Sequence, residues 1–326
     1  MKVALITGIN GQDGSYLAEF LLEKGYEVHG TLKRNSVAEN QTTRLEHIFN
    51  KVTLHYADLT DLASLVFVLQ KVRPEEVYNL AAQSHVRISF DQPLYTANAT
   101  GMGVLNMIEA VRLVDNSIKM YQASSSEMFG NSIDEDGFQR ETTPLIPVSP
   151  YGCSKVFGYN IARNYRNSYG MFISNGILFN HESPRRGSNF VTNKVAKTAV
   201  EIKLGLRDKL ALGNLNATRD WGHAKDYVEA MWMILQLDQP DDFVCATGIS
   251  HSVQDLVEHV FNRLEMDWEK YVIVDEKYLR PEELEDLKGD SSKLRERTGW
   301  NPEYTFKQMM DEMVDYWLDF YDNKRR

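Results

Sequence analysis

The chain has 326 residues, of which 43% are hydrophobic and 25% are charged, and its net charge at pH 7 is −10. This length fits one large α/β domain that carries a smaller lobe, because single cores rarely grow beyond ~250 to 300 residues. The acidic balance argues against nucleic acid and anionic membranes as partners, and no apolar run approaches the ~20 residues of a membrane span.

The N-terminal apolar run is short and leads directly into a glycine-rich turn, so we expect no signal peptide and a cytoplasmic location. Cys153 and Cys245 are the only cysteines and lie far apart in the sequence. We therefore expect two reduced thiols, no disulfide framework and no metal site.

Short segments rich in apolar and β-branched residues alternate with longer amphipathic segments, which is typical of a parallel sheet with helices on its faces. Helical periodicity is clearest over residues 15–24 and 62–72. We therefore predict an α/β fold with a doubly wound, Rossmann-like parallel sheet. The predicted strands cover residues 3–6, 26–31, 52–56, 76–80, 119–123, 172–178 and 243–246.

After about residue 180 this alternation weakens, and two polar stretches (180–189 and 213–222) and an acidic segment (276–290) follow. We expect a dinucleotide-binding domain over residues 1–180 and a smaller C-terminal substrate lobe over residues 181–326. A predicted helix at 228–237 and the strand at 243–246 return to the first domain at about 225–250. The two lobes are therefore expected to be interleaved.

Three glycines, Gly8, Gly11 and Gly14, follow the first strand and open the first helix. In this context they form a dinucleotide fingerprint, because glycines let backbone N–H groups approach a pyrophosphate at a helix N-terminus; a plain glycine turn is the alternative. The second strand ends in Lys33 and Arg34, where NAD-preferring proteins place an acidic residue. Cations there suit the 2′-phosphate of NADP; the alternative is a solvent-exposed basic loop that binds no ligand.

A tyrosine and a lysine, Tyr151 and Lys155, are four residues apart near the start of a predicted helix over residues 150–169 and therefore share one face. A nearby ammonium and a nicotinamide cation would favour the phenolate, which could then take a proton from a sugar hydroxyl. Ser125 and Glu127 end the fifth strand and should point into the same crevice. A redox enzyme of this kind needs only the hydroxyl, the tyrosine and the lysine, so Glu127 indicates a second proton transfer; a loop or helix cap is its alternative role.

Together these motifs resemble the extended short-chain dehydrogenase/reductase family and, within it, the GDP-mannose 4,6-dehydratases, over nearly the whole chain. The runs at residues 7–14, 78–84, 121–130, 149–152, 179–187 and 219–222 carry the resemblance. The chain departs from the family at Ser125, where threonine is usual, and in a longer, more acidic segment at 131–139. A serine keeps the hydroxyl, so we expect activity to survive this change.

The resemblance implies a lyase that converts GDP-mannose to GDP-4-keto-6-deoxymannose through transient oxidation at C4 by NADP, with Ser125, Glu127, Tyr151 and Lys155 as catalytic residues. A nucleotide-sugar 4-epimerase, a 4-keto-sugar reductase and a non-catalytic NADP-sensing protein are the alternatives, and a homodimer or homotetramer is the implied assembly. The implied cofactor residues are Gly8, Asn10, Gly11, Gln12, Asp13, Gly14, Arg34, Asp58, Leu59, Leu80, Ala82, Ser84, Tyr95, Lys155, His181 and Arg186, and the implied substrate residues are Ser84, Asn180, Asn189, Val191, Lys194, Gly213, Arg219, Arg280 and Glu283.

Overall fold

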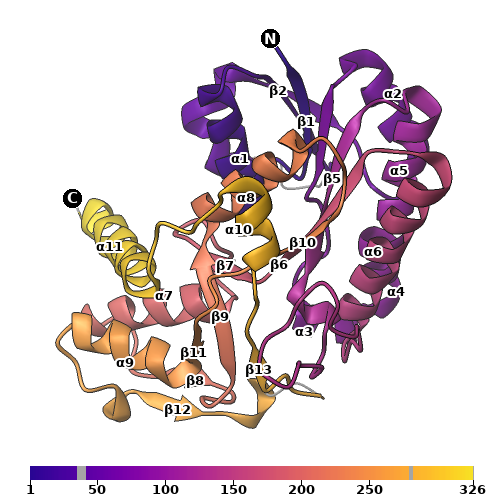
Figure 1. Ribbon diagram of the computed structural model, residues 1–326. Helices are drawn as coiled ribbons and strands as arrows, with labels where there is room; N and C mark the ends of the chain where they lie inside the picture. Colours follow the sequence, from indigo (N-terminus) through magenta and orange to yellow (C-terminus); the bar gives the residue numbers. More distant parts are fainter. Residues whose placement is uncertain (35–41, 279–281, 326) are drawn as a thin grey trace.

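The computed structural model describes residues 1–34, 42–278 and 282–325. Within these residues, seven parallel strands form the main sheet, in the order β10-β6-β5-β4-β1-β2-β3 (Figure 1). Each contains most of one predicted strand, and β3 has the predicted bounds. The strands are β1 (Val3–Thr7), β2 (Glu27–Leu32), β3 (Val52–Tyr56), β4 (Glu76–Asn79), β5 (Lys119–Ser125), β6 (Ile173–Leu178) and β10 (Asp242–Cys245).

Helices cover both faces of this sheet, as a doubly wound fold requires. On one face, α1 (Gln12–Glu23) packs against α8 (Ala224–Gln236), and their apolar side chains share a core with β1 and β2. On the other face, α2 (Leu62–Val72), α5 (Gly103–Val114) and α6 (Pro150–Tyr169) lie in a row (Figure 1). The short helices η1 (Thr43–Lys51), α3 (Val86–Asp91), α4 (Pro93–Thr96), η2 (Ala97–Met102) and η3 (Ser126–Met128) occupy connections between these elements.

The chain reverses its direction across the sheet between β1 and β4. Strands β2 and β3 continue to one side of β1, whereas β4, β5, β6 and β10 continue to the other. In open parallel sheets, ligands bind outside the carboxyl ends of the strands at such a switch point. The topology therefore fixes where a site should lie, between the ends of β1 and β4.

A second lobe lies below this edge of the sheet in Figure 1. It holds a four-stranded sheet of β7 (Asn180–Glu182), β9 (Thr218–His223), β11 (Ser250–Ser252) and β13 (Asp286–Leu287), and the pair β8 (Leu210–Leu212) and β12 (Val272–Val274). Its core contains apolar side chains of α7, α9 and α11. The helices of this region are α7 (Val191–Lys203), α9 (Val253–Arg263), η4 (Trp268–Lys270), η5 (Glu276–Tyr278) and α11 (Phe306–Arg325), whereas α10 (Ser292–Thr298) packs against α8 and β10 of the first domain.

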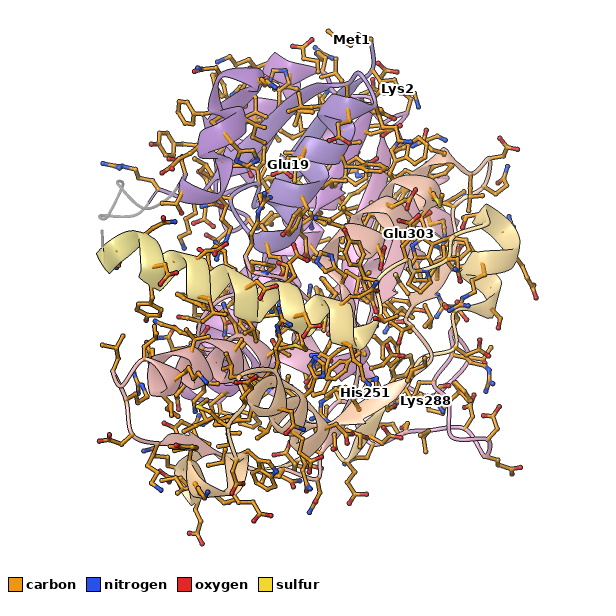
Figure 2. The ribbon with its side chains drawn as sticks, turned by 90° about the vertical axis from the view of Figure 1, so that its left-hand side faces the viewer. Met1, Lys2, Glu19, His251, Lys288 and Glu303 are labelled. Atoms are coloured by element: carbon orange, nitrogen blue, oxygen red, sulfur yellow. The ribbon has the colours of Figure 1, made fainter. Side chains whose placement is uncertain are left out.

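Chain segments cross between the two lobes more than once. The strands β7 and β9 belong to the second lobe, but the chain then returns to the first domain. There α8 packs on the main sheet and β10 pairs with β6 in it. Figure 2 shows α11 crossing one side of the molecule between the region of Glu19, on α1, and that of His251, on β11. None of the helices in the described part of the chain combines the length and the apolar character needed to cross a membrane.

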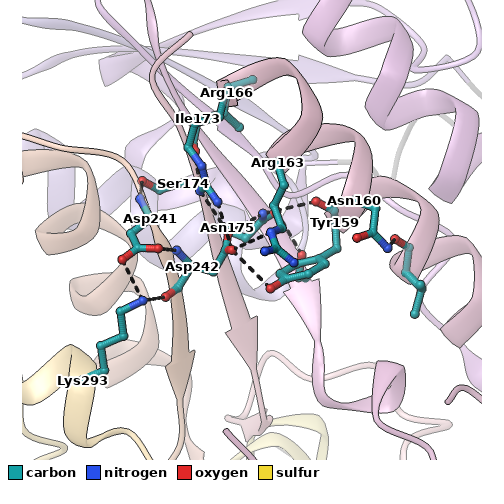
Figure 3. A network of polar contacts seen from close by, with 12 residues as sticks. Tyr159, Asn160, Arg163, Arg166, Ile173, Ser174, Asn175, Asp241, Asp242 and Lys293 are labelled. Carbon is teal, nitrogen blue, oxygen red and sulfur yellow. Dashed lines mark hydrogen bonds and ion pairs between the residues drawn. The ribbon is translucent and has the colours of Figure 1, made fainter. Parts of the chain in front are cut away.

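A buried ionic network fastens α6 to the sheet (Figure 3). The Asp242 carboxylate, on β10, accepts two hydrogen bonds of 3.0 Å from the Arg166 guanidinium, on α6. It also accepts one of 2.8 Å from the Asn175 amide, on β6, and one of 3.2 Å from the Tyr159 hydroxyl. Because partners surround the buried charge, α6 is held in place at the end remote from its N-terminus.

Candidate active site

One large cavity of about 1080 Å³ lies between the carboxyl edge of the main sheet and the second lobe. Residues of the glycine turn, of the ends of β4 and β5, and of α6 line one side of it. Residues of β7, α7 and β9 line the other side. The cavity therefore lies at the switch point of the sheet and is closed by the second lobe.

The glycine turn is built so that backbone, and not side chain, faces this cavity. Gly8 has a φ of +67°, a conformation that strains residues with a Cβ. The Gly11 N–H donates to the Gly8 carbonyl at 2.9 Å, and Gly11 caps α1. A Cβ on Gly14 would lie 2.4 Å from the Gly8 oxygen and 2.7 Å from the Ile9 Cα, so only glycine fits. The first turn of α1 thus presents its free N–H groups to the cavity, as an anion site requires.

An ion pair joins this helix to the opposite wall. The His181 Nε2 lies 2.8 Å from an Asp13 oxygen, and its Nδ1 lies 2.7 Å from the Phe179 carbonyl oxygen. Since both neighbours are acceptors, this geometry favours the imidazolium form, which can donate to both at once. Burial alone would lower the pKa of His181, but the charge and hydrogen bond of Asp13 outweigh it and raise that pKa.

The four predicted catalytic residues meet in this cavity. Ser125 ends β5 and accepts the Glu127 N–H at 3.3 Å, and the Glu127 side chain is buried in η3. Ser149 caps α6, and Pro150 occupies its first turn, so Tyr151 and Lys155 lie in the first two turns and face the same space. The Lys155 Nζ donates 2.8 Å to the carbonyl of Ala123, on β5.

Burial dominates the protonation of the tyrosine and the lysine. It raises the pKa of Tyr151 to about 12; a hydrogen bond with Ser125 opposes this rise, and the Glu127 charge adds to it. Burial lowers the pKa of Lys155 to about 8, and the Asp13 charge opposes this fall. The sequence suggests that the lysine lowers the pKa of the phenol. In the structure that effect does not overcome burial, because the ammonium lies against a carbonyl and 5.7 Å from the centre of the phenol ring.

The basic end of β2 adjoins the same cavity. Lys33 lines it and is held by Asp58 and by the Tyr95 hydroxyl, both at 3.1 Å from its Nζ. Arg34 does not belong to the lining residues, and its guanidinium lies 5.9 Å from the centre of the Tyr56 ring. The sequence names both cations and the resemblance selects Arg34, but of these two it is Lys33 that lines the cavity.

Cations and an aromatic ring line the opposite end of the cavity. Lys194 lies 3.5 Å above the ring of Tyr278 and donates to the Ala211 carbonyl at 2.6 Å. The Arg219 guanidinium donates to two carbonyls and lies 3.5 Å from a carboxylate oxygen of Glu283. Apart from Arg34, all the predicted cofactor and substrate residues that the structure describes line this one cavity. Arg280 lies outside the described residues.

Several lining residues are missing from the sequence prediction. Two of them, His85 and Arg87, lie within three residues of Ser84, and Lys197 and Glu201 continue the spacing of Val191 and Lys194 along α7, so helical periodicity could have found the second pair. Others, among them Arg207 and Asn214, also line the cavity, and no local pattern connects these two with it. No cluster of three metal-ligating side chains occurs in residues 1–34, 42–278 and 282–325.

Comparisons with known protein families and sequences are consistent with the geometry of this site. A family model described as GDP-mannose 4,6 dehydratase matches residues 5–313. GDP-mannose 4,6 dehydratase 1 of Arabidopsis thaliana is 52% identical over 326 residues, covering 96% of this chain and 89% of that protein. GDP-mannose 4,6 dehydratase of Homo sapiens is 50% identical over 340 residues, covering 96% and 90%.

Solved structures share the fold at lower identity. The dTDP-glucose 4,6-dehydratase of Bacillus anthracis in complex with NAD superposes with a TM-score of 0.85 at 22% identity, covering 99% of this chain and 98% of that one. UDP-glucose 4-epimerase of Thermotoga maritima gives a TM-score of 0.86 at 22% identity, covering 98% and 99%. Because epimerases and dehydratases share this scaffold, the structural likeness defines the fold alone.

Proposed function

Because the chain belongs to the GDP-mannose 4,6-dehydratase family, we propose that it removes water from GDP-mannose to give GDP-4-keto-6-deoxymannose. The observation that carries the proposal is the buried carboxylate of Glu127, which lines the cavity together with Ser125 and Tyr151. An elimination needs a base in addition to the group that handles the sugar hydroxyl, and Glu127 supplies it. A 4-epimerase, a 4-keto-sugar reductase or a silent NADP-sensing protein would have no need of this carboxylate.

We propose NADP as the cofactor, held at the glycine turn. The cradle fits a dinucleotide, because a Cβ at Gly14 would collide with the turn and because the N–H groups of α1 face the cavity. Lys33 and Arg34, at the end of β2, suit a 2′-phosphate. Asp58 and Leu59 would lie at the adenine, Leu80, Ala82 and Ser84 along the ribose, and Tyr95, His181 and Arg186 along the rest of the dinucleotide. Measuring binding of NADP and NAD by calorimetry tests the preference.

The chain's own residues divide the proton transfers between them. When bound, the dinucleotide takes a hydride from C4 and returns it to C6, with no net redox change. Tyr151 removes the O4 proton while Ser125 donates a hydrogen bond to O4. Because a ketone at C4 acidifies the C5 hydrogen, Glu127 removes that proton and passes it to the C6 hydroxyl, which leaves as water. Tyr151 then returns its proton to C5, so every group ends as it began.

The second lobe would hold the nucleotide. Lys194, Arg219 and Arg280 supply the positive charge that a diphosphate requires. Asn180, Asn189, Val191, Gly213 and Glu283 would complete the wall around the sugar and the base. With the diphosphate held by the second lobe, the sugar would extend toward Glu127 and Tyr151, which line the same cavity.

We also propose a cytoplasmic homodimer or homotetramer. Large apolar side chains stay exposed on neighbouring helices, among them Leu94 on α4 (79% exposed), Met102 on η2 and Phe157 on α6. Exposed apolar groups clustered in this way favour association. Light scattering on the purified protein measures the assembly directly.

The deciding experiment supplies GDP-mannose deuterated at C4, with no added reductant. We expect a 4-keto-6-deoxy product that carries the deuterium at C6. Glu127→Gln should lower kcat by ~10²- to 10⁴-fold while NADP stays bound. Glu141→Gln is the matched control, because that partly buried carboxylate accepts the Val244 N–H at 2.8 Å and does not line the cavity. No loss of water from GDP-mannose, together with NADPH consumption on a 4-keto sugar in a separate assay, would instead identify a reductase.

A further inference from the structure

One segment, residues 181–186, contacts two different parts of the molecule: some of its residues line the cavity, and others pack against the first domain. His181, Glu182 and Arg186 line the cavity, and the chain runs on from them through Asn189 to α7. Ser183 and Arg185 do not line the cavity and contact the first domain instead. The same few residues thus form part of the cavity wall, next to the proposed substrate residues Asn180 and Asn189, and touch α1, whose N-terminus follows the glycine turn.

Gln12, in the first turn of α1, makes the innermost of these contacts. Its amide nitrogen donates to the His181 carbonyl at 3.0 Å, and its amide oxygen accepts from the Ser183 hydroxyl at 2.8 Å. The Ser183 hydroxyl also accepts the Arg185 N–H at 3.1 Å. Because Ser183 and Gln12 are both buried, these hydrogen bonds have no competition from water, and losing one leaves a buried polar group unpaired.

Two arginines extend the contact outward. The Arg185 guanidinium reaches the Ser15 hydroxyl at 3.1 Å and the Glu19 carboxylate at 2.5 Å, and it lies 3.9 Å from the centre of the Tyr16 ring. Glu19, labelled in Figure 2, stands on the side of α1 that this segment meets. Arg185 is therefore anchored on the helix through a hydroxyl, a carboxylate and an aromatic face.

Arg44, in η1, completes the contact from a third element. Its Nε donates to the Arg185 carbonyl at 2.9 Å, and a terminal nitrogen donates to the Asn10 carbonyl at 3.1 Å. Asn10 lies within the glycine turn itself. Burial, together with the charge of Arg185, lowers the pKa of Arg44, so the fold places two cations side by side at some electrostatic cost. One guanidinium thus spans the dinucleotide turn and the substrate wall.

We propose that Gln12, Arg44, Ser183 and Arg185, which we call the seam, couple binding of the dinucleotide to binding of the nucleotide sugar. The proposal rests on the proposed function, since it assigns one ligand to each side. When phosphates order the glycine turn, Arg44 and Gln12 hold residues 181–186 in the position that places Asn180, His181 and Asn189. Coupling of this kind is reciprocal, so each ligand should tighten binding of the other. These four are positioning residues, and the proton transfers are carried out by Glu127 and Tyr151.

Calorimetry tests the seam without turnover. The Kd for GDP is measured on the full-length protein with and without saturating NADP, and the ratio of the two values is the coupling factor. We expect a factor of at least about five in the unaltered protein, within the usual range for coupled sites. Arg44→Met should bring it close to one, and Ser183→Ala, a smaller change, should lower it in the same direction.

Arg140→Met is the matched control. Arg140 also joins distant segments, binding Asp134, Asp136 and Asp290, but it does not line the cavity, and these three partners lie outside the seam. We expect this variant to lose stability and to keep the coupling factor. A factor of one in the unaltered protein, an unchanged factor in both seam variants, or an equal loss in Arg140→Met would overturn the seam. Failure of the unaltered protein to bind either GDP or NADP would overturn the proposed function itself.

Discussion

Replacing Gly14 by alanine should damage the dinucleotide cradle out of proportion to the single methyl group added. The new Cβ would lie 2.4 Å from the Gly8 oxygen, 2.7 Å from the Ile9 Cα and 2.8 Å from the Ile9 carbonyl carbon. All three are backbone atoms, so no side chain can turn aside to make room. A carbon and a carbonyl oxygen ordinarily approach to ~3.3 Å, so the turn and α1 must separate by ~0.9 Å.

That displacement has a cost in stability and in binding. Overfilling a packed site costs ~1 to 3 kcal/mol, which we expect in the free energy of unfolding measured with urea. A misplacement of ~1 Å in a binding group can cost ~10²-fold, which we expect in the NADP Kd measured by calorimetry. The two effects arise together because the clash lies between the turn and the helix whose N–H groups face the cavity.

Gly101→Ala provides the control. Gly101 is also buried, in η2, but a Cβ there would meet its nearest neighbours at 3.5 Å, an ordinary contact distance. It does not line the cavity, so the NADP Kd should stay unchanged. If Gly14→Ala bound NADP as tightly as the unaltered protein and unfolded at the same urea concentration, the reasoning from backbone contact would be refuted.

Two further predictions concern buried charges. Burial would raise the pKa of Asp13, but His181 outweighs it and lowers that pKa, while the pKa of His181 is raised; the stability that Asp13→Asn removes should therefore be largest between about pH 4 and 6.5. It should shrink as the pH rises through the raised His181 pKa, and also as it falls through the lowered Asp13 pKa. Urea unfolding across pH measures this, and a loss that stays constant into alkaline solution would contradict the ion pair. Arg166→Met should cost ~3 to 5 kcal/mol by leaving Asp242 without its two strongest donors; adding Asp242→Asn should recover part of that loss, and a cost below ~1 kcal/mol would show that Asn175 and Arg163 suffice.

The main sheet could be predicted because its strands carry their own signal. Each is a run of at least four residues with apolar side chains, and all but the edge strand β3 are buried over most of their length. The helices α2 and α6 have the predicted bounds for a similar reason. Asp61 caps one and Ser149 the other, and Arg73 and Gly170 end them in the left-handed conformation.

The second lobe could not be predicted in this way. Its strands β7, β8 and β13 have two or three residues, too few to show an alternation. The strand β9 reads as polar, yet Asp220 and His223 are both fully buried within it. Asp220 accepts hydrogen bonds from Thr247 and from the Gly248 N–H, and His223 lies 2.8 Å from a Glu312 oxygen. Partners so distant in the sequence turn a polar run into a core strand, and no local pattern contains them.

In the site, too, some features follow from local sequence and others depend on contacts between distant residues. Tyr151 and Lys155 are recognisable because helical spacing brings them together, and the glycines because their turn follows a strand. The ion pair between Asp13 and His181 joins residues 168 positions apart, so only the fold brings it about. The protonation of Tyr151 is also a feature that only the fold determines. Burial decides it, and a sequence does not reveal how deeply a phenol is buried.

That protonation constrains how the catalytic residues can work. With a pKa of about 12, the Tyr151 phenol is ionised in only ~1 molecule in 10⁵ at pH 7, so the resting protein holds an acid where the first step needs a base. An opposite charge within ~6 Å favours the ionised form of an acid by roughly one to three powers of ten. The charge of Lys155 is directed at the Ala123 carbonyl, which leaves an oxidised, cationic nicotinamide as the source. Tyr151 would then act as a base toward O4 while that charge is present and as an acid toward C5 once the hydride has neutralised it. The order of the two proton transfers thus follows from the burial of Tyr151. A change in the glycine turn that weakens dinucleotide binding should therefore impair Tyr151 as a base, in addition to removing the hydride acceptor.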